Sequence, residues 1–117
     1  MVNNNITHDS TQLNLIFSAL SDPIRRAMLL KLVDKQQSIA DLSAPFDISK
    51  SAVTKHIKVL EKAGLLKRTI DGRVHHCELA VSPLHVASDW MAFYQKFWDT
   101  KLDALDSYLT SSKKDNP

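Results

Sequence analysis

The chain of 117 residues is 44% apolar and 24% charged, which suits a single globular domain with a modest core, and its net charge of +2 excludes a globally basic protein. Its single cysteine, Cys77, excludes an intrachain disulfide scaffold, and no apolar run approaches the length of a membrane-spanning helix. The first residues have neither the basic start nor the apolar run of a signal peptide, so we expect a cytoplasmic protein without a membrane partner.

The N-terminal part of the sequence predicts two helices within one domain over residues 10–110. Residues 1–9 and 111–117 are polar and are expected to be flexible. The segment TQLNLIFSAL carries apolar residues at helical spacing, namely Leu13, Ile16, Phe17 and Leu20. A second helix is predicted to begin at Pro23, because Asp22 is suited to cap it and the first turn does not need the missing N–H.

The next segment predicts a helix-turn-helix. A short helix is expected over about residues 38–44, where Pro45 ends it. A longer helix is expected over about residues 50–63, because Ser49 can cap its start and Gly64 can stop it. A short helix, a brief turn and a longer basic helix are typical of this motif.

The chain then changes to a strand pattern and returns to a helix. The dipeptide Asp71-Gly72 lies between the β-prone runs LLKRTI and RVHHCEL, which predicts a hairpin. With these two residues in the turn, Ile70 would pair with Arg73, and Arg73 would lie at the tip. A long helix is predicted over residues 82–109. The expected fold class is therefore mainly α with a small β-hairpin.

Positive charge is concentrated in the middle of the chain. The segment from Lys50 to Arg73 contains seven Lys or Arg residues and two acids, a local balance of +5. From Glu78 onward, four lysines face six acids, a balance of −2. Such asymmetry indicates a polyanionic partner for the basic segment.

The basic helix separates its apolar and polar residues. At 100° per residue, Val53, Ile57 and Leu60 share the side that packs on the domain. The opposite side combines small hydroxyls with cations, namely Ser51, Thr54, Lys55, Lys58 and Lys62. Small polar groups near the start of a helix can reach base edges, and lysines can reach phosphates, so this side predicts DNA contact. A solvated lysine-rich face is the alternative.

The hairpin extends the same positive charge. We expect Lys67, Arg68 and Arg73 to lie along the DNA backbone or reach the minor groove. The alternative is a sheet edge that charge keeps soluble. His56 lies at the rim of the packed side of the basic helix, where it either donates to a phosphate or packs against a neighbouring helix.

The segments ALSDPIRRAMLLKLV, SIADLSAPFDISKSAVTKHIKVLEKAGLLKR and DGRVHHCEL together resemble the ArsR/SmtB family of bacterial winged-helix repressors. The resemblance covers about residues 11–109. It implies a winged helix-turn-helix with a long C-terminal dimerisation helix, and a homodimer that represses transcription from a palindromic operator. By position, it implies a DNA-facing set of Ser49, Lys50, Ser51, Thr54 and Lys55. Arg25 and Arg26 match the family's paired arginines, which we expect to be structural.

The last helix has an apolar side that is rich in aromatic residues, including Trp90, Tyr94, Phe97, Trp98 and Leu105. This is more aromatic surface than a chain of this size readily buries, and aromatic residues are enriched in interfaces. We expect these residues, with Leu13 and Phe17 of the first helix, to form a dimer interface. An intramolecular core and a groove for a small ligand are the alternatives.

The sequence lacks the metal ligands of many relatives. The segment IADLSAPFD before the basic helix has no Cys or His, and the last helix has no His beyond His85, so we expect no metal and no cofactor. Zinc, copper and arsenite should then not release DNA. The adjacent residues His75, His76 and Cys77 are interpreted as ordinary strand residues, and a metal-binding or thiol-sensing site is the less favoured alternative. His85 and Asp89, four residues apart, are too few for a zinc site.

Three functions compete. The leading hypothesis is a sequence-specific regulator of transcription that binds double-stranded DNA as a homodimeric repressor. The alternatives are a ligand- or thiol-responsive sensor of the same fold, using Cys77 or the aromatic helix, and a winged-helix module that binds protein. No enzymatic activity is expected, because no Ser/His/Asp set is apparent in the sequence.

Overall fold

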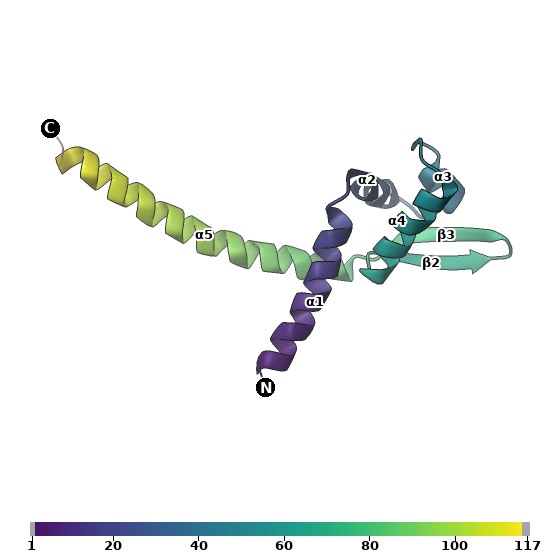
Figure 1. Ribbon diagram of the computed structural model, residues 1–117, viewed down its shortest axis with the longest axis horizontal. Helices are drawn as coiled ribbons and strands as arrows, with labels where there is room; N and C mark the ends of the chain where they lie inside the picture. The colour runs from purple at the N-terminus through teal and green to yellow at the C-terminus, as the bar shows by residue number, and fades with distance from the viewer. Residues whose placement is uncertain (1, 116–117) are drawn as a thin grey trace. The chain divides into compact units, whose positions relative to one another are not determined.

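The computed structural model describes the backbone of residues 2–115 and the side chains of residues 10–111 (Figure 1). The elements follow in the order α1 (Val2–Leu20), α2 (Pro23–Leu32), β1 (Gln37–Ser38), α3 (Ile39–Ser43), α4 (Lys50–Lys62), β2 (Leu66–Asp71), β3 (Val74–Leu79) and α5 (Ser82–Asp115). The chain divides between Ala87 and Ser88 into two compact units, the first with the sheet and helices α1–α4, the second with most of α5. The predicted fold class is confirmed.

The two terminal helices extend further than the apolar spacing predicted. Helix α1 begins at Val2 and α5 continues to Asp115. Residue 1 and residues 116–117 lie outside the described part of the chain, and flexibility of the two ends stays a prediction. Within the described residues, no helix combines the length and the apolar character needed to cross a membrane.

Local capping residues set the starts of α2 and α3. The Asp22 carboxylate accepts hydrogen bonds from the backbone N–H of Ile24 at 2.9 Å and of Arg25 at 3.0 Å, as its position predicted. Ser38 accepts from the backbone N–H of Asp41 at 3.1 Å, so the short helix begins one residue later than expected. These side chains satisfy N–H groups that the first turn of a helix leaves unpaired.

The core of the first unit is apolar and draws on every helix that encloses it. Its largest fully buried side chains are Ile16, Met28, Leu42, Ile57, Leu60, Leu65 and Cys77. Val53, Ile57 and Leu60 of α4, predicted from helical periodicity, lie in this core, and Ile16, Phe17 and Leu20 of α1 lie in it or pack against it. No described polar side chain is buried, so burial of apolar surface holds this unit together.

The sheet has three antiparallel strands in the order β1-β3-β2. The sequence pattern did not predict β1, because a strand of two residues has no detectable periodicity. In this strand, Gln37 pairs with Cys77 of β3. The hairpin turn lies one residue later than expected, so Ile70 pairs with His75 and not with Arg73, and Asp71 pairs with Val74. Gly72 has a φ of 63° and no other described residue of the turn has a positive φ, which favours glycine at the first central position of a type II′ turn. The turn is therefore Gly72-Arg73.

Candidate DNA interface

Helix α4 is capped at both ends by the residues predicted from the sequence, Ser49 and Gly64. The Ser49 hydroxyl accepts the backbone N–H of Ala52 at 3.1 Å. At the other end Gly64 has a φ of 77°, and its N–H donates to the Glu61 carbonyl at 2.9 Å. The next N–H, of Leu65, donates to the Leu60 carbonyl at 3.0 Å, which completes a Schellman motif. The helix therefore has a defined length and presents a fixed face.

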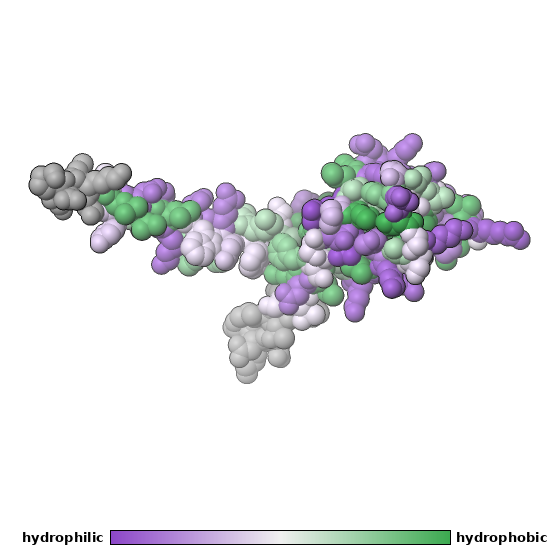
Figure 2. Space-filling view, turned by 45° about the horizontal axis from the view of Figure 1, so that its top comes forward, coloured by the Kyte–Doolittle hydropathy of each residue, from purple (hydrophilic) through white to green (hydrophobic). Residues whose placement is uncertain are grey.

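That face carries positive charge without a counterion among the described residues. Val53, Ile57 and Leu60 are buried, whereas Lys55, Lys58 and Lys62 on the other side and Lys50 in the first turn are exposed. None of the four forms an ion pair within the described part of the chain. Figure 2 shows hydrophilic side chains projecting from this unit. Unpaired ammonium groups along one helix make a surface for phosphate.

The hydroxyls of this face differ in their partners. Ser51 and Thr54 are both exposed. Thr54 Oγ1 donates to the Lys50 carbonyl at 3.0 Å, one turn back along the helix. Ser51 has no side-chain hydrogen bond to any described residue. The free hydroxyl of Ser51 can therefore both donate to and accept from a base edge.

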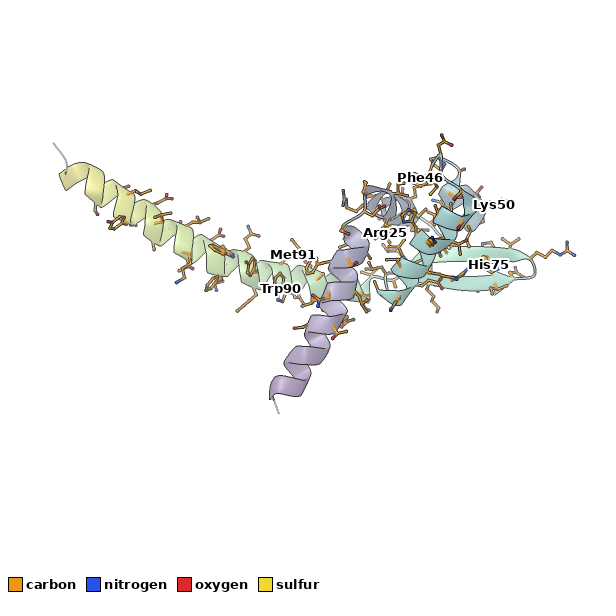
Figure 3. The ribbon with its side chains drawn as sticks, in the orientation of Figure 1. Arg25, Phe46, Lys50, His75, Trp90 and Met91 are labelled. Carbon is orange, nitrogen blue, oxygen red and sulfur yellow. The ribbon has the colours of Figure 1, made fainter. Side chains whose placement is uncertain are left out.

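The paired arginines bind backbone carbonyls at the end of α1, as expected for structural residues. Arg25 Nε donates to the Ala19 carbonyl at 2.7 Å and Nη2 donates to the Ser18 carbonyl at 3.0 Å (Figure 3 labels Arg25). Arg26 Nη1 donates to the Leu20 carbonyl at 2.7 Å. The last carbonyls of a helix have no intrahelical donor, so the arginines join the end of α1 to the start of α2.

His56 belongs to the same network. Its Nδ1 lies 3.2 Å from Arg25 Nη1 and 3.9 Å from the Asp22 carboxylate, and the side chain is 16% exposed. A guanidinium can only donate, so Nδ1 acts as the acceptor and the ring proton lies on Nε2. His56 therefore packs against Arg25 of the neighbouring helix α2, and its contact with a phosphate stays a prediction.

The hairpin cations fall into two groups. Lys67 and Arg73 are exposed, and Arg73 lies in the turn at the tip. Arg68 is half-buried: its guanidinium forms an ion pair with Glu61 of α4, and its Nη1 lies 3.5 Å from His75 Nδ1. Strand alternation explains the difference, because Arg68 lies on the same face of β2 as buried Leu66, whereas Lys67 lies on the other.

Comparisons with known proteins agree with this geometry. Residues 20–69 match a helix-turn-helix domain model. The transcriptional repressor SdpR of Bacillus subtilis is 29% identical over 79 residues, 68% of this chain and 88% of that protein. A transcriptional repressor SmtB homolog of Synechocystis is 33% identical over 69 residues, 59% of this chain and 52% of that protein. The crystal structure of an ArsR family transcriptional regulator is 37% identical, with a TM-score of 0.73 over 77% of this chain and 93% of that one.

The chain belongs to the ArsR/SmtB family. It is a DNA-binding transcriptional regulator with a winged helix-turn-helix fold, as the sequence resemblance implied. The fold and the family are those of transcriptional regulators and not of enzymes. Helices α3 and α4 form the helix-turn-helix of this ArsR/SmtB regulator, and strands β2 and β3 form its wing.

The described thiol and imidazole groups of this ArsR/SmtB regulator do not converge on one point. Cys77 is fully buried, and desolvation raises the pKa of its thiol. Among the described residues, no three His, Cys, Asp or Glu side chains are grouped so that they could hold a metal ion. His75 and His76 are half-buried strand residues, and His85 is exposed near the start of α5. The structure therefore supplies no assembled site at these positions.

A second surface of this ArsR/SmtB regulator lies on α5 in the second unit. Trp90, Tyr94, Phe97, Trp98 and Leu105 are between 41% and 50% exposed. The rings contact one another along the helix, with centroid distances of 4.9 Å for Trp90–Tyr94, 6.0 Å for Tyr94–Trp98 and 5.9 Å for Phe97–Trp98. This unit does not itself cover its aromatic side, because it is a single helix.

The two α1 residues predicted to join this interface lie in the first unit. Leu13 and Phe17 are half-buried, and Phe17 packs against the core.

Sequence analysis missed the internal partners of two cations, Arg68 and Arg25. Glu61, the one acid on the basic helix, was the available signal for the ion pair with Arg68. The contact of Arg25 with His56 spans 31 residues and had no local signal.

Proposed function

We propose that this regulator is a homodimeric repressor that binds a palindromic operator through two copies of α4 and the wing. The exposed, unpaired lysines of α4 carry the proposal, because they make a continuous cationic surface beside hydroxyls that can reach base edges. A regulator of this kind works where the chromosome is, so we place it in the cytoplasm. Repression by occupancy needs no chemistry beyond binding.

The contacts divide by their chemistry. Ser49, Ser51 and Thr54 lie in or just before the first turns of α4, where a recognition helix approaches base edges. Lys50, Lys55, Lys58 and Lys62 are suited to phosphates on either side of the major groove. Lys67 and Arg73 extend the cationic surface along the wing. His56 can donate from Nε2 to a phosphate while Arg25 holds Nδ1.

Arg68 is left out of this group of DNA-binding residues, although the sequence placed it there. Its guanidinium is engaged by Glu61, so binding to a phosphate would first have to break an ion pair. We propose that the pair positions β2 against α4 and thereby sets the angle of the wing. Arg68 then influences DNA binding only through this positioning.

The composition of α5 supports the proposed dimer. The second unit consists of one helix with a wide aromatic side, and in proteins most of the stability of a helix comes from the packing of its apolar side. Burial of these side chains against a second copy would remove a large apolar area from water. Leu13 and Phe17 of α1 are proposed to complete the interface. Twofold symmetry of the protein then requires two half-sites in the operator.

The alternatives have less support. A thiol sensor needs a reactive thiolate, whereas Cys77 is buried and the pKa of its thiol is raised. A module that binds only protein would leave the unpaired lysines of α4 without a role. No observation favours a metal-controlled regulator, and we propose that the protein binds its operator without metal.

The test combines hydrodynamics with DNA selection. Sedimentation at micromolar concentration should give a dimer of about twice 13.2 kDa. Selection from a pool of random duplexes should enrich a palindrome. In anisotropy titrations on that duplex, Lys55→Ala should weaken specific binding more than non-specific binding. Arg73→Ala should weaken both and should reduce the salt slope by about 0.9 for each phosphate that the variant no longer neutralises.

Arg68→Ala is the matched control, because it removes a cation of the same hairpin that is already paired. It should reduce the salt slope less than Arg73→Ala does, because Arg68 acts on DNA only through the position of the wing. A monomer in sedimentation, or equal effects of Arg68→Ala and Arg73→Ala on the slope, would contradict the proposal. Release of DNA by one equivalent of zinc, copper or arsenite would show that the protein has a metal site after all.

A further inference from the structure

Thr54 presents a different chemical group to DNA from the one that its residue type suggests. A hydroxyl has one proton, and that of Thr54 is committed to the Lys50 carbonyl at 3.0 Å. Donation to a base would break this bond. The other exposed substituent on Cβ is the methyl group, so Thr54 offers apolar surface on a helix face that is otherwise polar.

The surroundings of this methyl group are also apolar. A hollow between α3 and α4 is lined by Ile39, Ala40, Val53 and Thr54, and Lys50 and Ser43 border it (Figure 3 labels Lys50). Ala40 and Thr54 are exposed, Ile39 is half-buried and Val53 is buried. The hollow therefore opens on the exposed side of the helix-turn-helix and is floored by core residues.

One group on the base edges of the major groove matches this hollow. The 5-methyl of thymine is the apolar group that distinguishes a T·A pair there, and side-chain methyl groups of Thr and Ala are suited to contact it. We infer that Thr54 and Ala40 form a thymine-methyl site, so that the operator carries a required thymine at one position of each half-site. This inference rests on the proposed function, since it assumes that α4 enters the major groove.

Deoxyuridine tests the inference directly, because it pairs like thymidine and lacks only the methyl group. The full-length protein is titrated against the duplex recovered from a random pool, with each symmetric pair of thymines replaced in turn. One pair of replacements should weaken binding by about fourfold per half-site, the scale of one methyl group removed from water. Other positions should change little.

Two variants separate the methyl group from the hydroxyl. Thr54→Ser keeps the hydroxyl and should bind the thymine duplex more weakly than the wild type does, with reduced discrimination between the two duplexes because only the Ala40 methyl group remains. Thr54→Val keeps the methyl group and should retain both affinity and discrimination. Ser51→Ala is the control on the same face, and it should weaken binding to both duplexes equally.

The outcomes are distinct. Discrimination that stays as large in Thr54→Ser as in the wild type, or affinity lost in Thr54→Val as in Thr54→Ser, would overturn the inference while leaving the proposed function intact. So would a duplex in which no deoxyuridine replacement matters to the wild type. A protein that enriches no duplex at all would overturn the proposed function, and the inference would fall with it.

Discussion

Replacement of Arg25 by alanine should destabilise the first unit more than any other single change to an exposed or half-buried cation. The variant loses donors to the carbonyls of Ala19 at 2.7 Å and Ser18 at 3.0 Å, and also the donor to His56 Nδ1 at 3.2 Å. Hydrogen bonds to a charged group contribute about 1.5–3 kcal/mol each, and less where water can replace the donor. Ser18 is exposed and Ala19 is buried, so we expect a total loss of about 2–3 kcal/mol.

Arg26→Ala is the matched control for this change. It removes one bond, to the Leu20 carbonyl, from an exposed side chain, so its loss should be about 1 kcal/mol. Arg25→Lys should recover no more than about half of the loss, because an ammonium group cannot span two carbonyls and an imidazole as a guanidinium does.

The assay is denaturant unfolding followed by circular dichroism, with the protomer concentration held constant because association shifts apparent stability. In a thermal melt of the same variants, a loss of about 2–3 kcal/mol corresponds to a fall in Tm on the order of 10–15 °C for a chain of this size. The same variants are then titrated with DNA at several salt concentrations. Equal stability of Arg25→Ala and Arg26→Ala would refute the structural role, and so would a salt slope lowered by Arg25→Ala, which would mark Arg25 as a phosphate-binding residue.

Three further predictions concern other parts of the first unit. Gly64→Ala should lower the free energy of unfolding by about 1–2 kcal/mol in denaturant melts, because the φ of 77° disfavours a side chain and the new Cβ would lie 3.2 Å from Pro83 Cγ; an unchanged midpoint would contradict this. The Cys77 thiol should resist Ellman's reagent in the folded protein and react fully in denaturant, and fast reaction of the folded protein would show that the burial argument is wrong. The backbone N–H of Arg25 is the main cause that lowers the pKa of Asp22, so the stability that its ionised form contributes should be present above the unfolded value of 3.8 and be lost as pH falls below it. Asp22→Asn should therefore differ most from the wild type near neutral pH and least near pH 3, and a gap that widens on acidification would reverse the sign.

Much of the fold was predictable because short-range interactions decide where helices begin and end. Asp22, Ser38 and Ser49 each accept an N–H two or three residues further along the chain, and Gly64 adopts a positive φ that only local sterics control. The exposed face of α4 was predictable for a similar reason, since helical periodicity alone separates Val53 and Ile57 from Lys55 and Lys58. The hairpin register was not predictable, because Gly72 can take either the second or the first central position of the turn. The structure has it at the first, so Asp71 pairs with Val74.

The candidate site likewise has features that the sequence predicts and features that only the tertiary structure decides. Residue type and spacing determined by themselves that α4 is a basic helix with hydroxyls near its start. Only the tertiary structure decided which cations are free: Arg68 meets Glu61 where β2 packs on α4, and Arg25 meets His56 across 31 residues. Both contacts depend on the angle at which apolar faces pack together. Burial of apolar surface is non-directional, so the pattern of apolar residues predicts which faces meet and leaves their polar partners undetermined.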